Sequence, residues 1–313
     1  MGRETLHYII ASLCLGVIAV WASEALFWSA PPADLDPVGL ALTYAAYSVV
    51  CACVLSAVAW SGCGGWTGLF LGGALLGWLT EGVVVGTMYD VFPFQMVWTP
   101  LAWHALITAV LVFGLCRIAV RRRVISQIGM MLGIGLLGGT WAAFWPVERA
   151  DLPGTAAALW YLVGTGILVP PALILLDRIA TVPKPTAWVR AVAPMVAFAV
   201  WLVSSAFAPA PQRLALPMVL VLTLWAMRRL GQTQSPSDFG RRADNPRRHW
   251  LFLIAPTVTA LIAGQVWPLG GIAVNVPFAL ITGSVSLIWW VWLLVKAYRR
   301  KAISADAKSI APS

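Results

Sequence analysis

The chain has 313 residues, of which 60% are hydrophobic and 11% are charged, and its formal net charge is +9. A water-soluble domain of this length needs more polar surface than so few charged residues supply, so a soluble globular fold is excluded. The basic residues flank apolar segments and do not form one face, so no nucleic-acid partner is expected. Anionic lipid headgroups are the partner that such flanking charges indicate.

Ten apolar segments follow one another along the chain, each about 18–25 residues long and able to cross a hydrocarbon core of about 30 Å. The first is interpreted as a retained anchor, because its apolar run is too long for a cleaved signal peptide. The sequence predicts an all-α fold: a polytopic integral membrane helix bundle of about ten transmembrane helices, forming one transmembrane domain over 1–313. The expected spans are 8–30, 38–60, 64–88, 93–117, 124–146, 155–177, 187–207, 212–229, 250–267 and 272–296.

The loops between these spans differ in charge from one side of the predicted bundle to the other. Of the 21 Lys and Arg residues, all but Arg149 and Arg213 fall on the side that holds both termini. Positive charge near span ends marks the cytoplasmic side, so both termini are predicted to be cytoplasmic. A mobile basic loop at 230–249 and a tail at 299–313 are expected on that side, and the expected location is a bacterial inner (plasma) membrane.

Glu81 is the sharpest candidate for a functional residue, because it lies inside the third predicted span. A carboxyl group within a membrane is costly and usually faces a bundle interior or a watery cavity. Counting nine residues back from Asp90 places Glu81 about 13 Å below the outer surface. Gly73 and Gly77 share its helix face at a spacing of four and would let another helix approach closely. A proton or substrate site and a structural interhelical hydrogen bond are both open for this residue.

His104 lies in the next span, and the same count places it about 18 Å below the outer surface. Because the two spans form one hairpin, a contact between Glu81 and His104 is possible, although the rotation of each helix is not fixed by the sequence. Pro100 removes a backbone hydrogen bond nearby. A paired Glu and His can move a proton or activate a nucleophile, whereas an isolated His is a packing residue.

Three further residues are candidates for lining a substrate path. Glu24 lies near the outer end of the first span and either lines an outward-facing vestibule with Glu81 or reaches the headgroup region. Trp78 and Trp141 lie deeper than the tryptophans near the span ends and either line a cavity or pack between helices. No catalytic residue is assigned.

Motifs for several other chemistries are missing from the sequence. The three histidines, His7, His104 and His249, are scattered, so no metal site is predicted. No phosphate-binding glycine loop and no GxSxG motif occur, and no cofactor is predicted. The five cysteines lie within spans or near the cytoplasmic side, where a disulfide framework is not expected.

In length, in its ten spans and in its internal termini, the chain resembles the drug/metabolite transporters. This resemblance is one of architecture and rests on no motif. A weak internal similarity pairs Phe27-Trp28 with Phe144-Trp145 and relates the first span to the fifth, as duplicated hairpins or as chance recurrence of interfacial aromatic residues.

Three functions fit these features. The first is a membrane transporter, proton-coupled through Glu81 and His104, that moves a small or amphiphilic solute. The second is an intramembrane enzyme in which the same pair acts on a lipid or polyprenyl substrate. The third is a structural or assembly subunit whose polar residues only join helices. A compact bundle without extramembrane domains favours the transporter.

Overall fold

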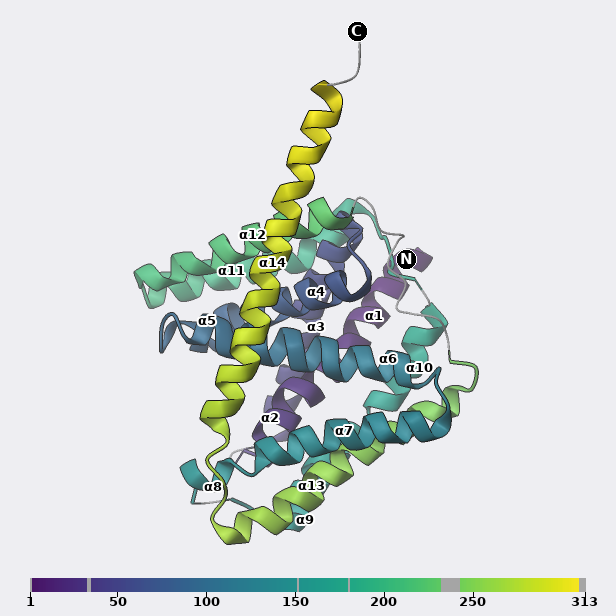
Figure 1. The fold of residues 1–313 in the computed structure, drawn as a ribbon, viewed down its shortest axis with the longest axis vertical. Coiled ribbons are helices and arrows are strands. Elements are labelled where there is room, and N and C mark those ends of the chain that lie inside the picture. Colours follow the sequence, from purple (N-terminus) through teal and green to yellow (C-terminus); the bar gives the residue numbers. More distant parts are fainter. Residues whose placement is uncertain (1, 33–34, 151, 180, 232–242, 310–313) are drawn as a thin grey trace.

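The computed structural model describes residues 2–32, 35–150, 152–179, 181–231 and 243–309, which form helices joined by loops (Figure 1). In this part of the chain, ten helical segments are long and apolar enough to cross a membrane. The predicted all-α polytopic membrane bundle is confirmed. Of the loop predicted at 230–249, residues 232–242 lie outside the described residues.

Several spans are built from more than one helical element. The first five are Arg3–Trp28 (α1, Arg3–Val20; η1, Trp21–Ala25; α2, Leu26–Trp28), Pro37–Ser61 (α3), Gly65–Val85 (α4, Gly65–Leu79; η2, Thr80–Val85), Gln95–Ala119 (α5, Gln95–Val97; η4, Trp98–Gly114; α6, Leu115–Ala119) and Val124–Glu148 (α7, Val124–Ala142; α8, Trp145–Glu148). The last five are Thr155–Ile179 (α9, Thr155–Gly166; α10, Val169–Ile179), Ala187–Phe207 (α11), Pro211–Gly231 (η5, Pro211–Leu214; α12, Ala215–Gly231), Pro246–Leu269 (η6, Pro246–Leu253; α13, Ile254–Val266; η7, Trp267–Leu269) and Asn275–Arg300, which is the first part of α14 (Asn275–Ser309).

Local sequence signals explain where α3 begins and where the third span ends. Asp36 accepts hydrogen bonds from the backbone N–H groups of Val38 and Gly39 at 2.8 and 2.9 Å and so caps α3 at its first turn. Gly86 adopts a φ of +90°, which a residue with a side chain rarely takes, and the helix ends at Val85. A short 3₁₀ turn, η3 (Thr87–Tyr89), follows and folds back toward the bundle.

The bundle is organised around α1, α3, α4 and η4, with two helix groups packed beside them. α4 lies along η4, and α1 packs on α3 and α10. α13 packs on α7 and α9 in the lower part of Figure 1, while α11 and α12 lie in the upper part. α11 buries only 6% of its most apolar window and α14 only 17%, so both present apolar side chains to the lipid bilayer.

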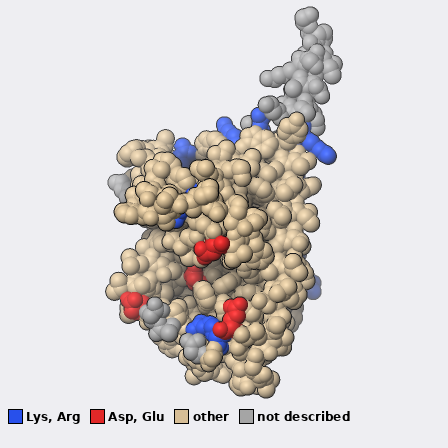
Figure 2. All heavy atoms as spheres, turned by 90° about the vertical axis from the view of Figure 1, so that its left-hand side faces the viewer, with Lys and Arg blue, Asp and Glu red and all other residues tan. Residues whose placement is uncertain are grey.

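The two ends of the bundle differ in charge. The acidic face carries exposed Asp36, Asp90 and Glu148, and Figure 2 views this end, where carboxylates stand around a hollow in a surface of few charges. The arginine-rich face at the opposite end of the spans carries basic side chains that include Arg117, Arg121, Arg178, Arg228 and Arg248.

Candidate functional site

Three spans depart from α-helical geometry at the residues that form the candidate site. The π-helical segment η1 holds Ser23 and Glu24, η2 holds Glu81, and η4 holds His104 and Thr108. A π-helical turn rotates the side chains that follow it relative to a regular α-helix, and such turns are frequent at functional sites.

Glu81 and His104 form a buried pair between η2 and η4. The Nε2 atom of His104 lies 2.9 Å from Oε1 of Glu81, and the two residues are only 2% and 9% exposed, respectively. The second carboxyl oxygen, Oε2, accepts a hydrogen bond from the Thr87 hydroxyl. Both oxygens of this carboxyl group therefore have protein partners.

The third span ends earlier than the sequence-based prediction. Because Gly86 ends the helix at Val85, Glu81 lies four residues from the end of its span. Burial comes from the fold-back of η3, in which Thr87 contacts the carboxyl group and the Tyr89 hydroxyl donates to Gly82 O at 2.8 Å.

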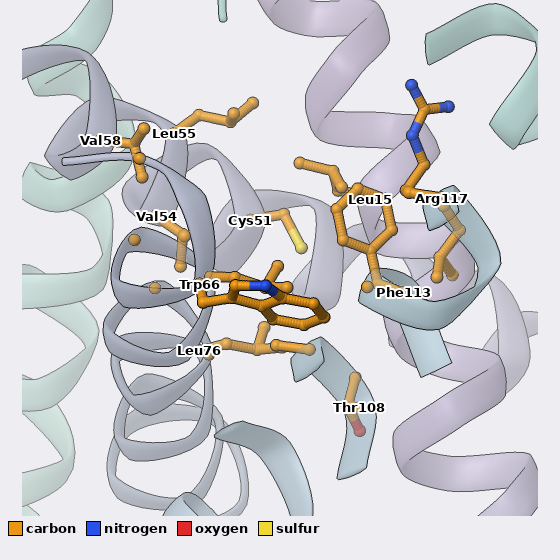
Figure 3. A pocket seen from close by; sticks show the side chains of 18 of the residues that line it. Leu15, Cys51, Val54, Leu55, Val58, Trp66, Leu76, Thr108, Phe113 and Arg117 are labelled. Atoms are coloured by element: carbon orange, nitrogen blue, oxygen red, sulfur yellow. The ribbon is translucent and has the colours of Figure 1, made fainter. Parts of the chain in front are cut away.

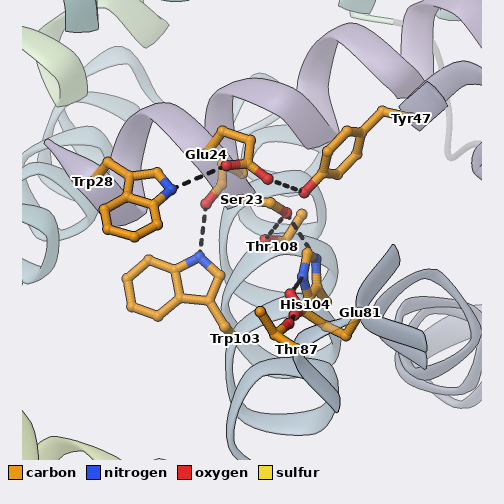
Figure 4. A network of polar contacts seen from close by, with 10 residues as sticks. Ser23, Glu24, Trp28, Tyr47, Glu81, Thr87, Trp103, His104 and Thr108 are labelled. Carbon is orange, nitrogen blue, oxygen red and sulfur yellow. Dashed lines mark hydrogen bonds and ion pairs between the residues drawn. The ribbon is translucent and has the colours of Figure 1, made fainter. Parts of the chain in front are cut away.

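A chain of hydroxyl groups continues from the other nitrogen of His104. Nδ1 lies 2.9 Å from Ser23 Oγ, which lies 2.9 Å from Thr108 Oγ1 (Figure 4). If His104 is neutral with its proton on Nε2, Ser23 donates to Nδ1; if His104 is protonated, Nδ1 donates to Ser23, and Ser23 donates to Thr108. The chain therefore has a complete hydrogen-bond pattern in both protonation states of His104. We refer to Thr87, Glu81, His104, Ser23 and Thr108 as the relay.

Glycines bring the two helices of the relay close together. A Cβ atom at residue 73 would lie 2.6 Å from Ala109 Cβ, and one at residue 77 would lie 2.4 Å from Pro100 O. Gly73 and Gly77 therefore allow backbone contact between α4 and η4, as their spacing predicted. This contact sets the distance between η2 and His104.

Glu24 lies beside the relay and hydrogen-bonds with two aromatic residues. It is half-buried, and its two oxygens accept hydrogen bonds from the Tyr47 hydroxyl at 2.5 Å and from Trp28 Nε1 at 3.1 Å. The ring centroids of Tyr47 and His104 are 6.3 Å apart, which places Tyr47 between Glu24 and the relay.

Trp78 and Trp141 are buried, and the indole of each donates a hydrogen bond to a backbone carbonyl group. Trp78 donates from Nε1 to Met96 O at 3.1 Å and packs edge-on against Trp290. Trp141 donates to Phe27 O at 2.7 Å within a cluster of aromatic rings, and Trp145 donates to the same carbonyl at 2.8 Å. Both candidate tryptophans thus join helices through backbone carbonyl groups.

Thr108 connects the relay to a cavity of about 300 Å³ between α1, α3, α4 and the η4–α6 span (Figure 3). Most of its wall is apolar, with Leu15, Cys51 and Phe113 among the lining side chains. Arg117 lies at one end of the view in Figure 3 and Thr108 at the other. The relay therefore ends in the wall of a space that extends to the arginine-rich face.

A second buried polar cluster lies at the arginine-rich face. Asp177 of α10 binds the Arg117 guanidinium through one carboxyl oxygen and His249 Nε2 at 2.8 Å through the other. The backbone N–H of Ala243 also donates to Asp177 at 3.2 Å. This cluster joins α6, α10 and η6, and it fixes Arg117 beside the cavity.

Sequence reasoning named Glu81 and His104 but missed Ser23, Thr87, Thr108 and Asp177. Hydroxyl residues are common in membrane helices, so the three hydroxyls gave no signal. Asp177 could have been recognised from the sequence, because it is an acidic residue within an apolar span next to the basic loop. In the described part of the chain, no group of three or more His, Cys, Asp or Glu residues is placed to hold a metal ion.

Comparison with known proteins gives no relative: no protein-family model, no curated protein and no solved structure matches this chain. The inference of function therefore rests on the geometry of the site.

Proposed function

We propose that this chain is a proton-coupled membrane transporter. The Glu81–His104 pair carries the proton, and a small or amphiphilic solute occupies the cavity beside Thr108. Three groups of the relay, the carboxyl of Glu81, the imidazole of His104 and the Ser23 hydroxyl, can each accept one proton and donate another, as proton transfer along a hydrogen-bonded chain requires.

One observation carries this proposal: the relay leads from the acidic face to the cavity without a break. Thr87 lies in the loop that also holds exposed Asp90, and Thr108 lines the cavity. Each step between them is a hydrogen bond, of which the three beyond Glu81 have heavy-atom distances of 2.9 Å. Ionisable groups at membrane depth are typical of proton pathways in transporters.

The same geometry favours transport over an enzyme that acts on lipid. A general acid or base must lie within hydrogen-bond reach of the reacting group. Glu81 and His104 do not line the cavity, and only Thr108 of the relay does. A solute in the cavity can thus meet the relay only at the Thr108 hydroxyl, and it does not contact the titratable pair.

The charge distribution supports an orientation for transport. The arginine-rich face is assigned to the cytoplasmic side, and the acidic face to the outside. In a bacterial inner membrane, the acidic face and Thr87 would then lie on the side from which protons enter, and the cavity would extend toward the cytoplasm.

Proton flux into proteoliposomes tests the proton pathway through the relay. The protein is reconstituted with a pH-sensitive dye inside, and a potassium diffusion potential drives protons inward. The proton flux of the wild type is expected to exceed that of protein-free liposomes. Glu81→Gln should lose at least 90% of that excess flux. Glu148→Gln, which changes an exposed acid of the same face, should retain it. Equal flux in Glu81→Gln and wild type would overturn the role of the pair.

A further inference from the structure

The cavity beside Thr108 has a polarity gradient along its length. Its middle is formed by apolar residues of four spans, including Ile18, Val54 and Leu76. At its arginine-rich end stand exposed Trp66 and Arg121, with buried Arg117 nearby. Along the η4–α6 span, Thr108 and Arg117 are nine positions apart and line different levels of the cavity. The space is therefore elongated and apolar, with basic side chains at one end.

The charge at this end has a single sign. Among the described residues that line the cavity, none is Asp or Glu, and the two charged ones are Arg117 and Arg121. Asp177, just behind the wall, pairs with Arg117 and holds its side chain in place. One carboxylate against two guanidinium groups leaves a net positive charge, which complements an anionic group at the mouth.

Glycines let bulky side chains pack around the cavity and keep it narrow. A Cβ atom at residue 114 would lie 2.8 Å from Leu69 Cδ2 and 3.0 Å from a ring carbon of Trp66, so Gly114 makes room for both side chains. Gly72 similarly makes room for Val54, whose Cγ1 would lie 3.2 Å from an added Cβ. A volume of about 300 Å³ is at the lower end of the range for small-molecule sites.

We propose that the cavity binds a single-chain anionic amphiphile, with its carboxylate or phosphate headgroup at Arg121 and Arg117 and its alkyl chain directed toward Thr108. This inference rests on the proposed transport function, because it names the class of solute that the transporter would carry. Arg121 supplies the exposed contact for the headgroup, and the apolar wall excludes a second charge near the relay.

Binding of radiolabelled decanoate to the protein in zwitterionic lipid nanodiscs tests this site without any proton gradient. Saturable binding above that of protein-free nanodiscs is expected. Decyl phosphate is expected to displace decanoate, whereas decyltrimethylammonium is not. Displacement by decyl phosphate would mean that either anionic source fits, and failure of decyl phosphate alone would restrict the site to carboxylates. Equal displacement by the cationic amphiphile, or no saturable binding, would overturn the proposal.

Variants locate the binding within the cavity. Cys51→Phe fills this space and is expected to weaken decanoate binding at least tenfold. Cys53→Phe makes the same change on α3 but faces a separate cavity of about 370 Å³, so it serves as the matched control. Leu15→Trp is a second filling variant in case Cys51→Phe does not fold. Wild-type affinity in both filling variants would exclude this cavity as the site.

The headgroup contact is tested by Arg121→Gln, which should weaken decanoate binding about fivefold, the effect of one partly solvated charge. Arg122→Gln, at a neighbouring exposed position that does not line the cavity, should leave affinity unchanged. Glu81→Gln should bind decanoate as the wild type does. Binding without proton flux in the wild type would therefore contradict the proposed proton pathway alone, and proton flux without binding would contradict this inference alone.

Discussion

The Nε2 atom of His104 lies 2.9 Å from Oε1 of Glu81, although the two residues belong to different spans and are 23 positions apart in sequence. Backbone contact at Gly73 and Gly77 brings their helices together, and the turn after Gly86 covers the carboxyl group. A buried pair of this kind stabilises the hairpin and also places two titratable groups in one hydrogen-bonded chain.

His104→Asn is expected to reduce proton flux in the liposome assay at least tenfold. The Asn amide can still hydrogen-bond with Glu81 or Ser23, but it cannot take up a proton near neutral pH. His7→Asn changes a histidine near the start of α1 and should retain the wild-type flux. Flux that is unchanged in both variants would mean that protons bypass the imidazole.

Ser23→Ala is expected to interrupt the relay between His104 and Thr108. The variant loses two hydrogen bonds, so it should lower proton flux about tenfold and destabilise the fold by about 1–3 kcal/mol. Ser12→Ala in the same span is the control, since Ser12 is also buried but donates only to Tyr8 O of its own helix. If both variants conduct protons equally, the hydroxyl of Ser23 is not a transfer step.

Gly77→Ala is expected to separate α4 from η4. The added Cβ would lie 2.4 Å from Pro100 O and 2.5 Å from Pro100 Cα, so backbone must move, at a cost of about 3 kcal/mol. Thermal unfolding in detergent should show a lower Tm and reduced proton flux. Gly133→Ala lies in α7 with no heavy atom within 4 Å of the new Cβ, so its Tm should stay equal or rise. A wild-type Tm for Gly77→Ala would contradict the close approach.

The reaction of the Cys63 thiol with iodoacetamide is expected to need a higher pH than that of an ordinary cysteine. Cys63 lies in the loop between α3 and α4, where burial raises the pKa of its thiol to about 11, against a smaller lowering by Arg300. Because only the thiolate reacts, the alkylation rate should keep rising about tenfold per pH unit above pH 9. An ordinary cysteine levels off near its pKa of about 8.5.

Mass spectrometry of the peptide that contains Cys63 separates its alkylation from that of the other cysteines. In the unfolded protein the same peptide should react with the ordinary profile, which serves as the control. A folded-state rate that levels off below pH 9 would mean that water reaches the thiol freely.

The fold could be predicted because apolar length and loop charge are local properties of the sequence. The spans at 124–146 and 187–207 match Val124–Glu148 and Ala187–Phe207 within two residues. The third span was predicted to end at residue 88, but it ends at Val85 because Gly86 takes a positive φ. The span contains several glycines, and the sequence does not show which of them ends the helix. The final helix extends to Ser309, so part of the segment expected as a tail, 299–313, continues α14.

The candidate site could be predicted only in part. Glu81 and His104 stood out because titratable residues are rare at membrane depth. Their contact with Ser23 and Thr108 depends on helix rotation, which the π-helical turns of η1, η2 and η4 alter in a way that periodicity does not reveal. The cavity depends on which side chains meet between four spans, and no single segment encodes that.

Infrared difference spectroscopy of the Glu81 carboxyl group tests the central claim most directly. The folded protein is titrated in H₂O and D₂O, with Glu81→Gln to identify the band. The proposed proton site predicts a carboxyl band, absent from the variant, that changes with pH and shifts promptly in D₂O, since a working relay exchanges protons with solvent. A band that does not change with pH and does not exchange would contradict proton transfer and leave the Glu81–His104 pair as a structural contact.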